Sequence, residues 1–157
     1  MGIEIERKFL VHKDKWDSLT KPKKDFYRQG YLFSDSNKTI RVRQTNDKGY
    51  ITIKGLVIGL SRPEFEYEIP KAEAEELLNK FSVSELIKVR YKILFKNKVW
   101  EIDEFLGDNL GLIVAEIELE HENEQFEMPD WIANEVTGIN KYYNSILAIF
   151  PFSKWKE

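Results

Sequence analysis

The sequence predicts an α+β protein whose main element is a closed, eight-stranded antiparallel β-barrel with helices packed outside it. Three observations lead to this prediction. Most of the 157 residues fall into segments with a two-residue alternation, which is typical of strands. The polar positions of these strands carry dense charge, and the sign of the charge is largely sorted by strand. Closing the sheet would face acidic and basic rows toward each other and would remove the exposed edges of an open sheet.

The first half of the chain contains turn residues between short alternating segments. The sequences SDSNK at 34–38 and TNDKG at 45–49 are rich in residues that favour turns. A short helix is expected near 14–19. The strands expected around these features cover roughly residues 3–11, 25–33, 39–45 and 50–54.

The second half begins with a strand near 62–69 that ends at Pro70, followed by a helix over 71–81 that is rich in helix-forming residues. Asp130 is expected to cap a helix through 131–136, and another helix is expected over 141–149. These helices would cover the outward apolar faces of the barrel. The remaining expected strands are 87–96, 99–105 and 112–121.

Composition narrows the classes of protein that the chain can represent. The 24 basic and 27 acidic residues give a net charge of −3, which does not favour a nucleic-acid partner. The absence of cysteine excludes disulfides and thiolate sites. The longest apolar stretches, such as 110–115, are too short to cross a bilayer, and no signal peptide is evident. We therefore expect one domain over residues 1–157, located in the cytoplasm, with no membrane partner.

The charged strand faces contain the candidate functional residues. A single charged face is usually a solvated surface, and this alternative applies to each strand taken alone. Six or more such strands favour a hydrated, charged tunnel instead. Arginine and lysine bind phosphate oxygens, whereas clustered carboxylates bind hard divalent cations such as Mg²⁺ or Mn²⁺. A polyphosphate with its metal requires both kinds of side chain together.

Several motifs in this order resemble those of the CYTH proteins, also called triphosphate tunnel metalloenzymes. The opening EIERKFLV at 4–11 is similar to the Glu-x-Glu-x-Lys signature of that family. The resemblance spans nearly the whole chain. Its further segments are RQGYL at 28–32, IRVR at 40–43, TIKG at 52–55, RPEFEYEIP at 62–70, KVRY at 88–91, WEIDEFLGDNLGLIVAEIELE at 100–120 and EVTGINKYYNSILA at 135–148.

The resemblance implies an eight-stranded barrel around a charged tunnel, and it implies a role for each matching residue. Tyr31 would pair with Lys8 and help to position or activate the attacking water, so these two are the catalytic candidates. The implied triphosphate-binding residues are Lys8, Arg41, Arg43, Lys54, Lys88, Arg90 and Lys141. The implied metal ligands, for Mg²⁺ or Mn²⁺, are Glu4, Glu6, Glu116, Glu118, Glu64, Glu66 and Asp103.

The activity that the resemblance implies is metal-dependent hydrolysis of a triphosphate. Inorganic tripolyphosphate is the expected substrate, with ATP or thiamine triphosphate as further possibilities. Two alternatives stay open at this point. One is a class IV adenylate cyclase, which makes cyclic AMP and pyrophosphate from ATP, and the other is a binding module for polyphosphate or nucleotides without turnover. A homodimer is also compatible with the sequence.

Overall fold

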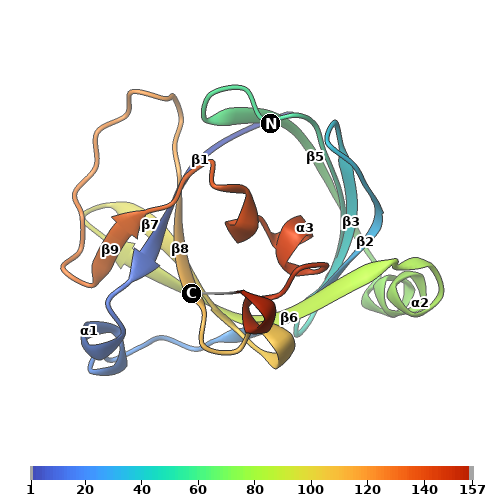
Figure 1. Ribbon diagram of the computed structural model, residues 1–157, viewed down its shortest axis with the longest axis horizontal. Helices are drawn as coiled ribbons and strands as arrows, with labels where there is room; N and C mark the ends of the chain where they lie inside the picture. Colours follow the sequence, from blue (N-terminus) through green and yellow to red (C-terminus); the bar gives the residue numbers. More distant parts are fainter. Residues whose placement is uncertain (1, 156–157) are drawn as a thin grey trace.

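Nine strands form one antiparallel sheet in residues 2–155, the part of the chain that the computed structural model describes. The sheet order is β5-β4-β3-β2-β6-β7-β8-β1-β9, and a pairing between β1 and β5 closes the first eight strands into the predicted barrel (Figure 1). The strands are β1 (Gly2–Val11), β2 (Asp25–Ser34), β3 (Thr39–Gln44), β4 (Gly49–Lys54), β5 (Ser61–Ile69), β6 (Ser84–Phe95), β7 (Lys98–Phe105), β8 (Ile113–Glu118) and β9 (Ile132–Glu135).

The ninth strand corrects the expectation of a helix over 131–136. Strand β5 pairs with β1 only from Gly2 to Ile5, so the same edge of β1 is left open further along. Strand β9 pairs with β1 through Phe9 and Val11, which satisfies backbone groups that would otherwise lack partners. The strand is also held by Trp131, which is buried beside it.

Two helices and the β9 region cover parts of the outward face of the barrel. Helix α1 (Lys13–Asp17) brings Trp16 into a cluster with Phe9, Trp100 and Trp131. Helix α2 (Lys71–Phe81) packs Ala74 and Leu78 against Val42, as predicted for an outer helix (Figure 1). Gly30 permits this approach, because a Cβ atom there would lie 2.7 Å from a methyl carbon of Leu78. No helix in residues 2–155 has both the length and the apolar character needed to cross a membrane.

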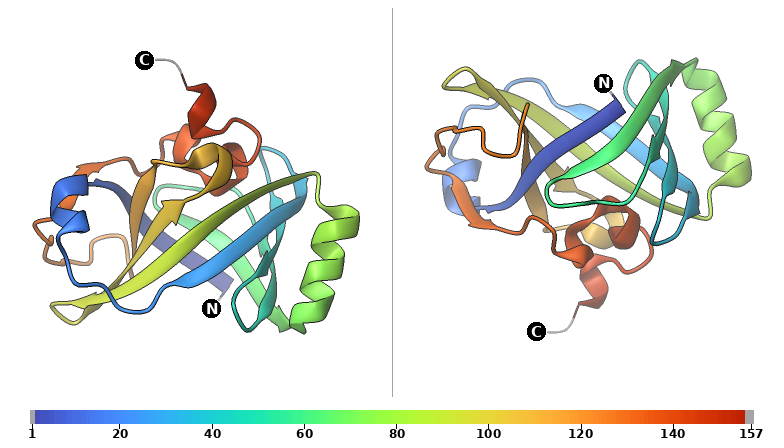
Figure 2. Two further views of the ribbon diagram at one scale, coloured as in Figure 1. Left: turned by 90° about the horizontal axis from the view of Figure 1, so that it is seen from below. Right: turned by 90° about the horizontal axis from the view of Figure 1, so that it is seen from above.

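The C-terminal segment differs from the expected outer helix over 141–149. It forms two short turns of 3-10 helix, η2 (Asn140–Tyr142) and η3 (Phe152–Lys154), on either side of helix α3 (Asn144–Leu147). These lie across one end of the barrel rather than along its wall (Figures 1 and 2). Another 3-10 turn, η1 (Gly107–Asn109), precedes β8.

The reason for this placement lies in the inward strand faces, which change from charged to apolar toward that end. Charged Lys8 is followed on the same face of β1 by Leu10, and Glu116 on β8 is preceded by Val114. On β6, Leu86 precedes Lys88 in the same way. The apolar ends of these rows form a cluster with Val136, which follows β9, and with Tyr142 and Leu147 of the C-terminal segment.

Candidate active site

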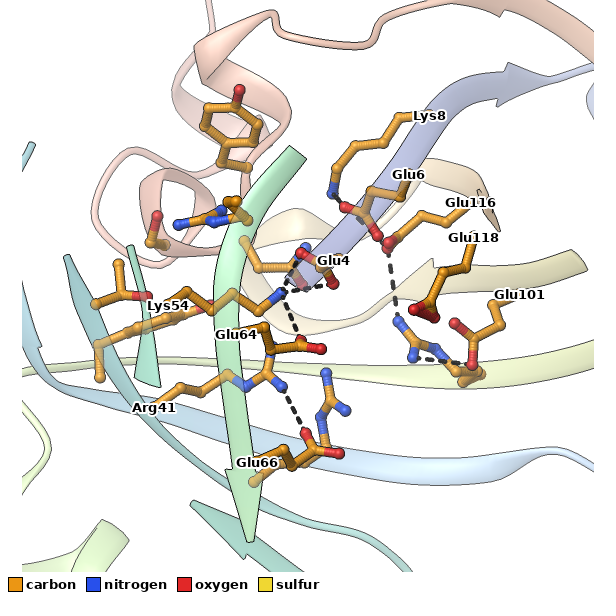
Figure 3. A pocket seen from close by; sticks show the side chains of 18 of the residues that line it. Glu4, Glu6, Lys8, Arg41, Lys54, Glu64, Glu66, Glu101, Glu116 and Glu118 are labelled. Atoms are coloured by element: carbon orange, nitrogen blue, oxygen red, sulfur yellow. Dashed lines mark hydrogen bonds and ion pairs between the residues drawn. The ribbon is translucent and has the colours of Figure 1, made fainter. Parts of the chain in front are cut away.

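A cavity of about 180 Å³ lies inside the barrel, between the charged parts of the inward strand faces. Side chains from opposite walls point toward one another across it (Figure 3). The C-terminal segment contributes Tyr143, Asn144 and Ser145 to its lining. The predicted residues that line the cavity are Glu4, Glu6, Lys8, Tyr31, Arg41, Arg43, Lys54, Glu64, Glu66, Lys88, Arg90, Glu116 and Glu118.

Arg41 of β3 lies on one wall beside two acceptors. Its Nη2 atom donates to Thr52 Oγ1 at 3.2 Å and to Glu66 Oε2 at 3.3 Å, and Thr52 itself donates to Glu66 at 2.8 Å. The Nε atom of Arg41 is buried and has no hydrogen-bond partner in the described residues. A buried donor without a partner is costly, so this guanidinium favours an anion in the cavity.

Lys88 and Arg90 of β6 share the buried carboxylate of Asp103 on β7. Lys88 Nζ donates to Asp103 at 2.8 Å, and Arg90 donates to the same carboxylate at 2.7 and 2.9 Å. Burial opposes the charge of Asp103, but Arg90 and Lys88 outweigh it and hold the pKa at about 2. For Lys88 the balance is reversed, because burial together with Arg90 and Arg43 lowers its pKa to about 7 despite Asp103.

Lys54 of β4 joins two carboxylates from neighbouring strands. Its Nζ atom lies 3.1 Å from both oxygens of Glu4 and 3.5 Å from Glu64 (Figure 3). Burial would raise the pKa of Glu4, but Lys54 outweighs it and the pKa falls below its ordinary value. Burial and the charge of Glu4 raise the pKa of Glu64, so the two carboxylates compete for one ammonium group.

Lys8 lies between Glu6 on its own strand and Glu116 on β8, with Nζ 3.7 Å from each carboxylate. Burial disfavours the ammonium, but these carboxylates and Glu4 outweigh it and raise the pKa of Lys8. Burial and Glu116 raise the pKa of Glu6 well above its ordinary value. At Glu118, burial and the charges of Glu4 and other carboxylates have the same effect. At Glu116, by contrast, Lys8 and Arg90 outweigh burial and hold the pKa well below its ordinary value, so the cations compensate the carboxylates of this wall unequally.

Two predicted site residues lie outside the cavity lining. Asp103 is only 1% exposed, and its carboxylate accepts hydrogen bonds from Lys88 and Arg90 that hold these two side chains in place. Lys141 is exposed, and its Nζ atom lies 4.3 Å from the ring centroid of Trp155. The expected Lys8–Tyr31 pair is not seen as a hydrogen bond in residues 2–155. The ring near Lys8 Nζ is that of Tyr143, with its centroid 5.9 Å away.

Sequence reasoning missed several residues that complete the site. Gln29 is buried and accepts a hydrogen bond from Arg43. The alternation of RQGYL places it on the face of Tyr31, so this signal was present. The lining residues of the C-terminal segment carried no such signal, because the expected helix was assigned to the outer wall. The other lining residues that were not predicted are Thr39, Arg62 and Glu101.

The fold and the site define a closed β-barrel with an internal cavity that has both acidic and basic walls. The family model for the CYTH domain matches residues 2–145, so the chain belongs to the CYTH, or triphosphate tunnel metalloenzyme, family. It is 52% identical to an inorganic triphosphatase of Acetivibrio thermocellus over the full length of both chains. An inorganic triphosphatase of Nitrosomonas europaea is 33% identical, over 93% of this chain and 97% of that protein.

Solved structures agree with this assignment. A crystal structure of an inorganic triphosphatase covers 92% of this chain and 93% of its own, with a TM-score of 0.63 and 30% identity. A putative adenylate cyclase from Bacillus halodurans is only 18% identical and has a TM-score of 0.60, which shows a common fold. The predicted barrel is confirmed by these comparisons.

Proposed function

We propose that this protein is an inorganic triphosphatase that hydrolyses tripolyphosphate to pyrophosphate and phosphate. The full-length identity of 52% to an inorganic triphosphatase carries the proposal. The cavity supports it independently, because its lining is dominated by charged side chains from facing strands. Such a lining suits a small polyanion, whose oxygens accept hydrogen bonds from arginine and lysine.

The acidic wall of the cavity, formed by the glutamates of β1, β5 and β8, supports a requirement for a divalent cation. Enzymes of the CYTH family share this requirement. The donors of this wall are all carboxylate oxygens, the ligands that Mg²⁺ and Mn²⁺ prefer. In residues 2–155 no three acidic or histidine side chains already converge as a preformed metal site. Burial and the charges of neighbouring carboxylates raise the pKa values of Glu6, Glu64 and Glu118, and a bound cation would relieve this unfavourable clustering of negative charge.

Glu4, Glu6, Glu116 and Glu118 are the residues that we propose to hold Mg²⁺ or Mn²⁺, together with Glu64 and Glu66. When bound, such an ion shares the negative charge that develops during phosphoryl transfer. The lysines that pair with these carboxylates would then be free to donate to phosphate. Asp103 has no role as a ligand in this proposal, because Lys88 and Arg90 occupy its oxygens.

The cationic residues bind the substrate and stabilise charge in this proposal. Arg41, Arg43, Lys54, Lys88 and Arg90 donate to phosphate oxygens from several sides of the cavity. Lys8 stays protonated at neutral pH because its carboxylate neighbours raise its pKa. Lys8 therefore supplies positive charge and does not accept the proton of the attacking water. Tyr31 lines the same cavity, and its hydroxyl is available to orient that water.

The test is an assay of the purified protein with tripolyphosphate, ATP and thiamine triphosphate, in Mg²⁺, in Mn²⁺ and in excess chelator. We expect phosphate and pyrophosphate from tripolyphosphate, faster turnover of it than of the other two substrates, and no turnover in chelator. Cyclic AMP and pyrophosphate from ATP would instead indicate a cyclase. Turnover of none of the three, or full activity in chelator, would refute the proposal.

A further inference from the structure

Gln29 is a fully buried, neutral side chain among the cations of the barrel. It lies on β2 directly opposite Arg43 of β3. A buried primary amide needs partners for its donors and its acceptor, and both ends of this one are engaged. Its Nε2 atom donates to Asn144 Oδ1 at 3.2 Å and to Tyr31 Oη at 3.3 Å, and its Oε1 atom accepts from Arg43 Nε at 3.2 Å.

Arg43 differs from most of the other cations of the cavity in its partners; among the lining cations of residues 2–155, only Arg62, which donates to the backbone oxygen of Gly55, likewise forms no ion pair. Lys8, Arg41, Lys54, Lys88 and Arg90 each form an ion pair with a carboxylate. In residues 2–155, Arg43 forms none. Its guanidinium is held by the Gln29 oxygen and by the face of Tyr27, whose ring centroid lies 4.7 Å away. Because only Nε is used by Gln29, the two terminal nitrogens are left for an anion.

Asn144 connects this arrangement to Lys88 on the other side of β2. Its Oδ1 atom accepts from Gln29 and also from Lys88 Nζ, at 2.8 Å. Gln29 is thereby hydrogen-bonded to Arg43 on β3 and to Asn144 of the C-terminal segment, and Asn144 connects it to the ammonium group of Lys88 on β6. All of the atoms that it holds belong to residues lining the cavity.

We propose that Gln29 is a positioning residue that orients Arg43 toward the substrate while leaving its charge uncompensated. This inference rests on the proposed function, since it assigns a phosphate-binding role to Arg43. The proposal requires an amide side chain at position 29. A glutamate at position 29 would keep the shape and the acceptor, but it would form a buried ion pair with Arg43 and oppose a phosphate. An apolar side chain would keep neither the bond nor the orientation.

The first test needs no substrate and measures solvent exchange of the Arg43 Nε–H proton by NMR. In Gln29→Met this proton should exchange about tenfold faster, because its acceptor is gone. In Gln29→Glu it should stay protected. Gln125→Met is the matched control, since Gln125 is exposed and its side chain bonds, within residues 2–155, only to the backbone of Asn123. Equal protection in wild type and Gln29→Met would overturn the proposal.

The second test is a double-mutant cycle with Arg43→Ala, measured as tripolyphosphate affinity in the presence of EDTA. Gln29→Met should weaken binding about tenfold when Arg43 is present and by less than about twofold when it is absent. Gln29→Glu should weaken binding more strongly than Gln29→Met, although the glutamate side chain has nearly the same volume as that of glutamine. An equal loss in both backgrounds would mean a general structural role and would overturn the proposal.

The two proposals fail separately in these experiments. Neither the exchange measurement nor the cycle requires turnover. A wild-type protein that binds tripolyphosphate without hydrolysing it would refute the proposed activity and leave the role of Gln29 standing. If the Gln29→Met protein did not fold, the Gln29→Glu variant would still decide the question, through retained protection of Arg43 Nε–H and lost affinity.

Discussion

At the scale of single residues, the protonation state of Lys88 should change when a phosphate binds. Its ammonium is fully buried and contacts one carboxylate, which it shares with Arg90. Burial and the nearby guanidinium groups lower its pKa to about 7. A bound polyphosphate adds negative charge beside it and favours the protonated form. Protonation of Lys88 and substrate binding are therefore linked.

This linkage predicts opposite effects of pH on binding and on stability. Raising the pH from 6.5 to 8.5 removes the Lys88 proton in the free folded protein, so affinity for tripolyphosphate should fall. The unfolded chain keeps that proton to about 10.5, the ordinary lysine value. The contribution of Lys88 to the free energy of unfolding should therefore rise over the same interval.

The measurement is calorimetric titration at both pH values, with Lys88→Arg as the reference because arginine stays charged. Subtracting the pH dependence of the variant removes the titration of tripolyphosphate itself. We expect a residual loss of affinity of several-fold in wild type alone. The same pH dependence in wild type and Lys88→Arg would contradict the prediction, provided that thermal unfolding shows the variant to be folded.

Glu118 gives a second prediction at this scale. Its side chain lines the cavity, where partial burial and nearby carboxylates raise its pKa. Glu118→Gln should reduce turnover of tripolyphosphate by at least about 100-fold, because a proposed metal ligand is lost, yet change the free energy of unfolding by less than about 0.5 kcal/mol. Glu76→Gln on the exposed side of α2 is the control; it should leave turnover unchanged and, because it removes only an exposed ion pair with Lys80, change the free energy of unfolding by no more than about 0.5 kcal/mol. Near-normal turnover of Glu118→Gln would place the metal elsewhere.

At the scale of elements, the two-residue alternation was enough to predict the eight barrel strands, and helix-forming residues with helical spacing of the apolar positions were enough to predict α2, because each element has one largely apolar face. It was also enough to place Arg41, Lys54 and Glu116 on inward faces. The short β9 was not predictable in this way. Its four residues form a strand because one edge of β1 is open beyond Ile5, and such an edge arises only from the barrel as a whole.

The same limit applies to contacts that depend on distant parts of the chain. The bonds of Gln29 to Arg43 and Asn144 join residues 14 and 115 positions apart in the sequence. Likewise, a sequence that places Asp103 and Glu101 on one face does not say which of them reaches the cavity. The cations of β6 decide this, because they enclose Asp103 and leave Glu101 in the lining.

Strand β9 also provides a prediction about what holds an added strand to the barrel. Trp131 is 4% exposed and packs against Trp16 and Trp100, with ring centroids 5.6 and 6.1 Å away. Trp131→Ala should therefore lower the free energy of unfolding by about 3–5 kcal/mol. At the other end of the strand, Glu135 forms a partly exposed ion pair with Arg7. Glu135→Gln should cost less than about 1 kcal/mol. Chemical denaturation of both variants is the measurement, and similar losses would contradict the dominance of packing.

At the scale of the whole molecule, the interior of the barrel is divided along its length. The charged part forms the cavity, and the apolar part is filled by the C-terminal segment. Tyr142 and Leu147 pack into that end, which places Tyr143, Asn144 and Ser145 at the boundary between the two parts. The same apolar contacts therefore complete the core and form one end of the site.

This division predicts that a substitution in the apolar cluster at the end of the barrel will also disturb the residues that line the cavity. Leu147 is fully buried, whereas Ile149, two residues further on, is 66% exposed. Leu147→Ala should lower the free energy of unfolding by about 2–5 kcal/mol, and Ile149→Ala should change it by less than about 0.5 kcal/mol.

The Leu147→Ala substitution should also weaken the hydrogen bonds that Asn144 accepts from Gln29 and Lys88, because only two residues separate Asn144 from position 147. Hydrogen exchange monitors this at the backbone amides of Val136, Tyr142 and Leu147, which donate to Lys8, Ile139 and Tyr143. In Leu147→Ala their protection should fall below that of the strand amides of β2 and β6, since the segment opens locally while the barrel stays closed. Protection that falls equally in the segment and in the barrel strands would mean that the two parts unfold as one unit.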